Sequence, residues 1–77
     1  MRGKERITLE REKRDELVKA IIVYFKEERG EELGQLAAGL VLDFIVERIA
    51  PEFYNQGVID SCAYMNERVE DMESLLL

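Results

Sequence analysis

Residues 31–50 read EELGQLAAGLVLDFIVERIA, and this stretch decides the fold. At about 100° per residue, the α-helical period, its apolar side chains cover more than half of the helix circumference. Only a narrow strip around Glu32, Asp43 and Glu47 is polar. A surface helix of a globular protein buries an apolar stripe of roughly 100°. We therefore expect residues 31–50 to form a central helix that is covered on several sides.

Pro51 marks the expected end of this central helix. Proline lacks the N–H that the helical ladder needs, and it disfavours the α conformation in the residue before it. The helix should therefore stop near Ile49.

A second helical pattern precedes the central helix and runs from Arg11 to Glu28 or Arg29. Its apolar face is formed by Leu17, Val18, Ile21, Ile22, Tyr24 and Phe25. Gly30 should end it, because glycine tolerates the left-handed conformation that often follows a last helical turn. The connection to the central helix is then very short, which favours an antiparallel hairpin of the two helices.

After Pro51, the pattern is ambiguous for residues 52–57 and clear from Val58 onward. Residues 52–57 form either a single helical turn closed by Gly57 or the first turns of a third helix. From Val58 onward, apolar residues recur at alternating spacings of four and three, the a and d positions of a heptad repeat. We call this set the seam: Val58, Cys62, Met65, Val69, Met72 and Leu76. A seam of this kind packs against another helix, either of the same chain or of a second copy.

The N-terminal residues complete the expected fold. Residues 1–6 are short, charged and terminal, and we expect them to be disordered. Ile7, Thr8 and Leu9 alternate apolar and polar, which predicts a short extended segment. It either lies as a strap over the core or pairs with the same stretch of another copy. The predicted fold is all-α, a single domain of residues 1–77 with three helices.

Size and composition point to association with a partner. A chain of 77 residues builds only a modest core, and small domains usually add disulfides, a metal or a partner chain. With one cysteine, Cys62, and no histidine, the first two are not expected. Cys62 itself is interpreted as an inert core residue. We expect a homodimer, and the interface candidates are Leu42, Val46, Ile49, Met65, Val69 and Met72.

Charge and hydropathy limit the other classes of function. The net charge is −6, yet residues 1–14 carry a net +3, which leaves −9 for the rest. An acidic body repels phosphate backbones, so we do not expect nucleic-acid binding, except through this basic arm. The first residues lack the apolar run of a signal peptide, and no stretch of about 18 apolar residues could span a bilayer. The sequence therefore predicts a soluble, cytoplasmic protein.

One polar group lies next to apolar residues after Pro51. Its members, the interaction candidates, are Tyr54, Asn55, Gln56, Gly57 and Asp60. They offer hydrogen-bond donors and an acid for a binding site, or they are structural. In the structural interpretation, Asn55 caps a helix and Gly57 permits a tight turn. No catalytic constellation is present, so we expect no enzyme activity, no metal and no cofactor.

The chain resembles a family of short bacterial proteins catalogued as a domain of unknown function, number twenty-one sixty-four. The resemblance covers Ile7 to about Met72. It rests on Ile7-Thr8-Leu9, Tyr24-Phe25, Gly34 with Leu36-Ala37-Ala38, Leu42-Asp43-Phe44, and above all Pro51 with Phe53-Tyr54-Asn55-Gln56-Gly57-Val58 and Asp60. The chain departs at Gly39, where the family tends to have an acidic residue. The resemblance implies a small, bacterial, cytosolic, helical protein without an established activity.

Two hypotheses for the function follow. The first is a protein-interaction or regulatory module that acts as a homodimer and binds an unknown protein partner. The second is a DNA-binding regulator of the ribbon-helix-helix type, in which paired strands from two chains enter the major groove. Its candidate contacts are Arg6 and Thr8.

Overall fold

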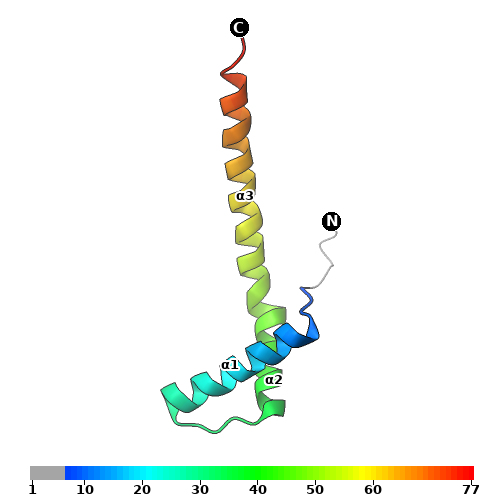
Figure 1. The fold of residues 1–77 in the computed structure, drawn as a ribbon, viewed down its shortest axis with the longest axis vertical. Helices are drawn as coiled ribbons and strands as arrows, with labels where there is room; N and C mark the ends of the chain where they lie inside the picture. Colours follow the sequence, from blue (N-terminus) through cyan, green and yellow to red (C-terminus); the bar gives the residue numbers. More distant parts are fainter. Residues whose placement is uncertain (1–6) are drawn as a thin grey trace.

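A single long helical rod dominates the protein, and a second helix lies across one end of it (Figure 1). The computed structural model describes residues 7–77. The elements are α1 (Arg11–Arg29), α2 (Gln35–Phe44), the π-helical turn η1 (Ile45–Ile49) and α3 (Ala50–Glu73). Because α2, η1 and α3 follow one another without a break, residues 7–77 form two helices rather than the three predicted. The all-α class is confirmed, and the prediction of disorder for residues 1–6 lies outside the described residues.

Helix α1 has the bounds that its sequence pattern predicts. It begins at Arg11 and ends at Arg29, and Gly30 follows in the left-handed conformation with φ 67°. The Gly30 N–H donates to the Lys26 carbonyl over 3.1 Å, and the Glu31 N–H donates to the Phe25 carbonyl over 3.0 Å. These bonds satisfy carbonyls that the helix end would otherwise leave unpaired. Gly30 therefore both stops α1 and turns the chain back towards it.

The rod begins later than the sequence pattern predicts. Residues 30–34 are not helical, and α2 starts at Gln35 rather than at Glu31. Gly34 has an extended backbone and takes the N-cap position, where its carbonyl accepts a 2.9 Å bond from the Ala38 N–H. Glycine is accepted at this position. The first helical turn of the prediction is therefore used as the connection between α1 and α2.

The predicted stop at Pro51 is wrong, because a π-helical turn carries the rod through it. In η1, the Ala50 N–H bonds to the Ile45 carbonyl, five residues back instead of four. Such a turn contains one extra residue and displaces the carbonyls that precede the proline. A proline in a regular α-helix would clash with the carbonyl four residues back, whereas Pro51 lies in the first turn of α3, where its missing N–H needs no partner. The rod therefore continues to Glu73.

The core of the single chain is small and lies between α1 and α2. Among residues 7–77, Ala38 and Leu42 are the buried apolar side chains, 0% and 3% exposed. The opposite face of α2 is open, with Leu36 81% and Leu40 62% exposed. The expectation of a central helix covered on several sides is therefore met on one side only.

The overall dimensions show how little of the chain packs against itself. The radius of gyration is 19.0 Å, and the longest extent is 66 Å. A compact domain of this length would have a radius of gyration of about 11 to 12 Å. The N-terminal segment adds no sheet, since the structure assigns no strand within residues 7–77. The predicted extended segment, Ile7–Leu9, has no regular secondary structure.

Candidate interaction surface

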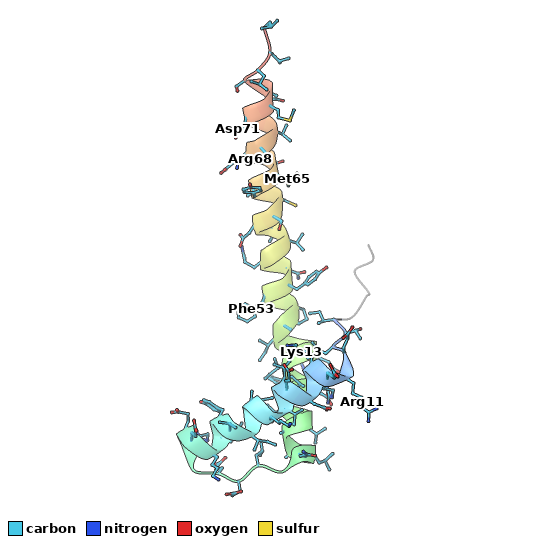
Figure 2. All side chains as sticks on the ribbon, viewed as in Figure 1. Arg11, Lys13, Phe53, Met65, Arg68 and Asp71 are labelled. Atoms are coloured by element: carbon cyan, nitrogen blue, oxygen red, sulfur yellow. The ribbon has the colours of Figure 1, made fainter. Side chains whose placement is uncertain are left out.

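Helix α3 extends away from the rest of the chain, and its apolar side chains are open to solvent. Within the described part of the chain, its only neighbouring element is η1, which continues directly into it. Figure 2 shows side chains projecting from this helix on all sides with no second helix beside them. Val58, Met65, Val69 and Met72 of the seam are 47%, 57%, 52% and 68% exposed. Cys62, predicted to be a core residue, is also exposed.

A shallow, open groove follows this face of α3. It is lined by Phe53, Tyr54, Gly57, Val58, Ser61, Cys62, Met65 and Asn66. The repetition at intervals of three and four shows that these residues share one helical face. Gly57 contributes no side chain, and a Cβ atom there would meet nothing within 4 Å, so this part of the groove is open. Three seam residues therefore lie in the groove, and the last of the seam, Leu76, lies beyond the helix end.

The interaction candidates around Tyr54 do not form one site. Tyr54 and Gly57 line the groove, whereas Asn55, Gln56 and Asp60 are not among its lining residues. Gln56 and Asp60 are one turn apart, and the Gln56 amide donates a 3.0 Å hydrogen bond to the Asp60 carboxylate. The structural interpretation is wrong as well, because Asn55 and Gly57 lie inside α3 and neither caps a helix nor forms a turn. The stretch is a plain, fully exposed segment of helix.

Arg68 is the one basic residue of α3, and it is bonded within its own helix. Its guanidinium lies 2.8 Å from the Asp71 carboxylate and 3.8 Å from that of Glu67. It also lies over the Tyr64 ring, 4.8 Å from the centroid. Figure 2 labels Arg68 and Asp71 on the upper part of the rod. All of these partners are exposed, so each ion pair contributes at most about 1 kcal/mol.

The dimer-interface candidates separate into two groups. Met65, Val69 and Met72 lie on the free face of α3, where an interface could form. On the rod below, Leu42 is buried within the chain itself, Val46 is half-buried and Ile49 is 38% exposed. The sequence analysis did not select Leu36, Leu40 and Phe44, which are 81%, 62% and 55% exposed. Their spacing of four residues was visible, but it could not show which side of α2 would face α1.

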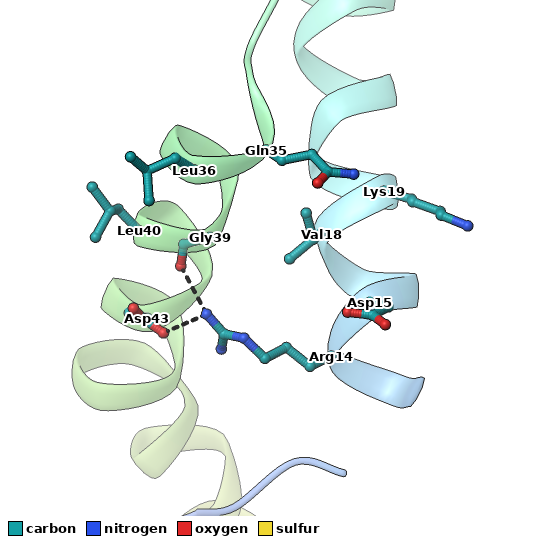
Figure 3. Close-up of a pocket in the computed structure, with 9 residues that line it drawn as sticks. All are labelled: Arg14, Asp15, Val18, Lys19, Gln35, Leu36, Gly39, Leu40 and Asp43. Atoms are coloured by element: carbon teal, nitrogen blue, oxygen red, sulfur yellow. Dashed lines mark hydrogen bonds and ion pairs between the residues drawn. The ribbon is translucent and has the colours of Figure 1, made fainter. Parts of the chain in front are cut away.

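A polar contact holds α1 against α2 beside the small core (Figure 3). The Arg14 guanidinium lies 2.9 Å from the Asp43 carboxylate and donates a 3.4 Å bond to the Gly39 carbonyl. Val18 and Leu40 are among the residues that line the open pocket around it. Asp43, on the polar strip of the predicted central helix, is thus the partner of an arginine from α1.

The rest of the chemistry in the described residues is sparse. No group of three or more potential metal-ligating side chains occurs in residues 7–77. A search of the same residues finds no helix with the length and apolar character needed to cross a bilayer. Residues 1–6 of the basic arm, with the candidate contact Arg6, lie outside the part of the chain that the structure describes.

Comparison with known proteins places the chain in one family. Residues 7–77 match the model of the family described as uncharacterized conserved protein (DUF2164), and the chain belongs to that family. The resemblance seen in the sequence is thereby confirmed. Comparisons with curated proteins and with solved structures found no match.

Proposed function

We propose that this DUF2164 protein is a small helical association module that acts as a homodimer, with the free face of α3 as the surface on which two copies meet. One observation carries the proposal: a 24-residue amphipathic helix leaves its apolar seam uncovered by any element of residues 7–77. Exposed contiguous apolar patches of this kind usually mark sites of association.

The energetics of the single chain support the same conclusion. Ordering the backbone opposes folding by about 1 to 2 kcal/mol for each residue. Burial of a leucine side chain returns about 1.5 to 3 kcal/mol, and in residues 7–77 only Leu42 and the smaller Ala38 are buried. In proteins, most helix stability comes from packing of the amphipathic face rather than from intrinsic propensity. A partner that covers the seam would supply the packing free energy that the single chain lacks.

A homodimer is the simplest source of such a partner. Two-fold pairs are the commonest oligomers, and they present the same patch on both subunits. The stability of a dimer that shares its core increases with protein concentration, by mass action. In the proposed role, the paired rods form a scaffold, and the remaining surface is free to bind another protein.

Sedimentation equilibrium combined with far-UV circular dichroism tests this proposal. At micromolar concentration we expect a species of twice the protomer mass of 9.0 kDa. Dilution should lower the helical signal together with the mass, because α3 loses its packing when the copies separate. A species of 9.0 kDa that keeps its full helical signal would contradict the proposal.

A further inference from the structure

We infer that two copies pair through α3 side by side, parallel and in register, so that each seam residue meets its own counterpart. The inference rests on the proposed homodimer and adds the direction and alignment of the two helices. Two features of α3 carry it, the amide of Asn55 and the charged pair Arg68 with Glu73, and Cys62 provides the probe that tests it.

Asn55 extends the heptad of the seam by one position towards the N-terminus of α3. It lies seven residues before Cys62 and fourteen before Val69, so all three occupy a positions, and Val58, Met65 and Met72 occupy d positions. An asparagine at a single a position specifies the register and the number of strands of a coiled coil, at some loss of stability. In a parallel pair the two Asn55 amides face each other, and each offers both a donor and an acceptor.

The charges beside the seam agree with this alignment. Arg68 occupies a g position and Glu73 the following e position, the two sites that face each other between parallel strands. A parallel pair therefore forms the Arg68–Glu73 contact twice. The other acidic residues of α3 after Val58 occupy outward heptad positions, so their charge does not oppose self-pairing: Asp60, Glu67, Glu70 and Asp71.

Antiparallel pairing of the same seam is less favourable. Two antiparallel alignments of the copies keep the seam residues from Val58 to Met72 paired. In both alignments, the g positions of one copy face the g positions of the other, and the e positions face the e positions. One places Glu52 against Glu73 of the second copy and Asn55 against Met72, an amide against an apolar side chain. The other places Arg68 against Arg68. Like charges at these positions oppose association, and an unpaired amide in an interface is destabilising.

Two single-cysteine proteins test direction and register directly. One is the natural chain with Cys62, and the other carries Cys62→Ala with Val69→Cys. Positions 62 and 69 are about 10 Å apart along a helix. In a parallel, in-register pair both cysteines meet their counterparts, so a short thiol-to-thiol cross-linker should join both proteins into covalent dimers. In an antiparallel pair, only residues at the centre of the overlap meet their own copies, so at most one protein would cross-link.

The control is Cys62→Ala with Ala63→Cys, which places the thiol one residue along the helix and away from the seam. It should remain uncross-linked. If the chain sediments as a dimer but only one of the two seam cysteines cross-links, or neither, parallel pairing is overturned and the homodimer stands. If the chain sediments at 9.0 kDa, the homodimer itself is overturned.

A subunit-mixing experiment tests the charge pairing between the two copies. Arg68→Glu alone brings two carboxylates together at each g–e contact, and Glu73→Arg alone brings two guanidinium groups together, so each variant repels its own copy. In a pair made from one chain of each variant, the carboxylate introduced at position 68 of one chain faces the guanidinium introduced at position 73 of the other, and the natural Arg68–Glu73 pair remains at the second contact. Both contacts of the mixed pair are therefore attractive. 

Equilibrated mixtures of the two variants, separated by mass, should contain mixed dimers in severalfold excess over random exchange. A random distribution would contradict the charge pairing.

The matched control mixes the natural chain with Arg68→Glu. A parallel mixed pair then has one attractive and one repulsive contact, the mean of the two self-pairs, so random exchange is expected. An antiparallel pair with Arg68 facing Arg68 would instead favour mixing here, and that result would overturn the inference.

Discussion

The hairpin of α1 and α2 and the free length of α3 are both built from amphipathic helix, yet they leave their apolar side chains in different surroundings. In the hairpin, α1 covers one face of α2, and Ala38 and Leu42 are almost wholly buried. On α3, the seam residues remain about half exposed or more. The cause is local, because the connection at residues 30–34 returns the chain to α1, whereas η1 continues α2 into α3, which extends away from α1.

The comparison shows that a helix can have a core-like pattern without a core in its own chain. The seam of α3 is as regular as that of a bundle helix, but the helix that buries it from solvent must come from another molecule. Substitutions in the two regions should therefore differ in kind. Those in the hairpin should change the stability of each protomer, and those on α3 should change association.

The largest effect is expected from a charge in the middle of the seam. Met65→Lys would bury two ammonium groups, one from each copy, against an apolar face. We expect association to weaken by about 2 to 6 kcal/mol or more for the pair, since each polar group without a partner costs about 1 to 3 kcal/mol, and a charged group costs more. Sedimentation equilibrium measures this change. The matched variant Ala63→Lys adds the same charge away from the seam, and equal weakening by both would contradict the assignment of the face.

A smaller effect is expected in the hairpin. Leu42→Ala removes the larger of the two buried side chains, and such a truncation typically destabilises by about 2 to 5 kcal/mol. We expect a loss near the lower end, because the small core can relax. Urea unfolding at fixed protein concentration measures it. At urea concentrations where Leu42→Ala is still folded, its Cys62 residues should still cross-link. Loss of cross-linking there would show that the hairpin and the free length of α3 are not independent.

The smallest change in stability is expected from replacing two glycines inside the rod by alanine. Gly→Ala in a helix interior stabilises by about 0.5 to 1 kcal/mol where the new methyl group fits. At Gly39 a Cβ would lie 3.6 Å from Arg14 Nη2, an ordinary contact, so Gly39→Ala should gain this amount. At Gly57 a Cβ meets nothing in the single chain, and in the heptad of the seam this residue occupies a c position, which faces outward from the proposed pair. Gly57→Ala should therefore gain a similar amount in thermal unfolding, and a clearly smaller gain would indicate that a partner packs against this side of the helix.

The sequence was sufficient for the helical class, the bounds of α1 and the seam, because each depends on local periodicity or on a glycine with a required conformation. Gly30 is the clearest case, since its left-handed backbone follows from the residue type. Pro51 is the opposite case. The rule that proline ends a helix assumes regular α-helical bonding before it, and the π turn that removes the clash has no recognisable pattern in residues 45–49.

The candidate site was only partly predictable. The periodicity identified Met65, Val69 and Met72 as members of one helical face, and that face is open, as are the other faces of α3. It could not identify the open face of α2, because Leu36, Leu40 and Phe44 share a helix with Leu42 and only tertiary contacts decide which side α1 covers. Asn55 was interpreted as a cap because the helix was expected to begin near it, whereas a helix that starts at Ala50 places it in the heptad.

The extra residue in η1 also sets the rotational phase between the two ends of the rod. Each residue of an α-helix turns the chain by about 100°. Removing one residue from Ile45–Ile49 would therefore swing the α1–α2 end around the axis of α3 by roughly that angle, with neither surface altered. It would also bring Pro51 against the carbonyl four positions before it. In two copies paired through α3, the single inserted residue thus determines the direction in which each α1–α2 hairpin points.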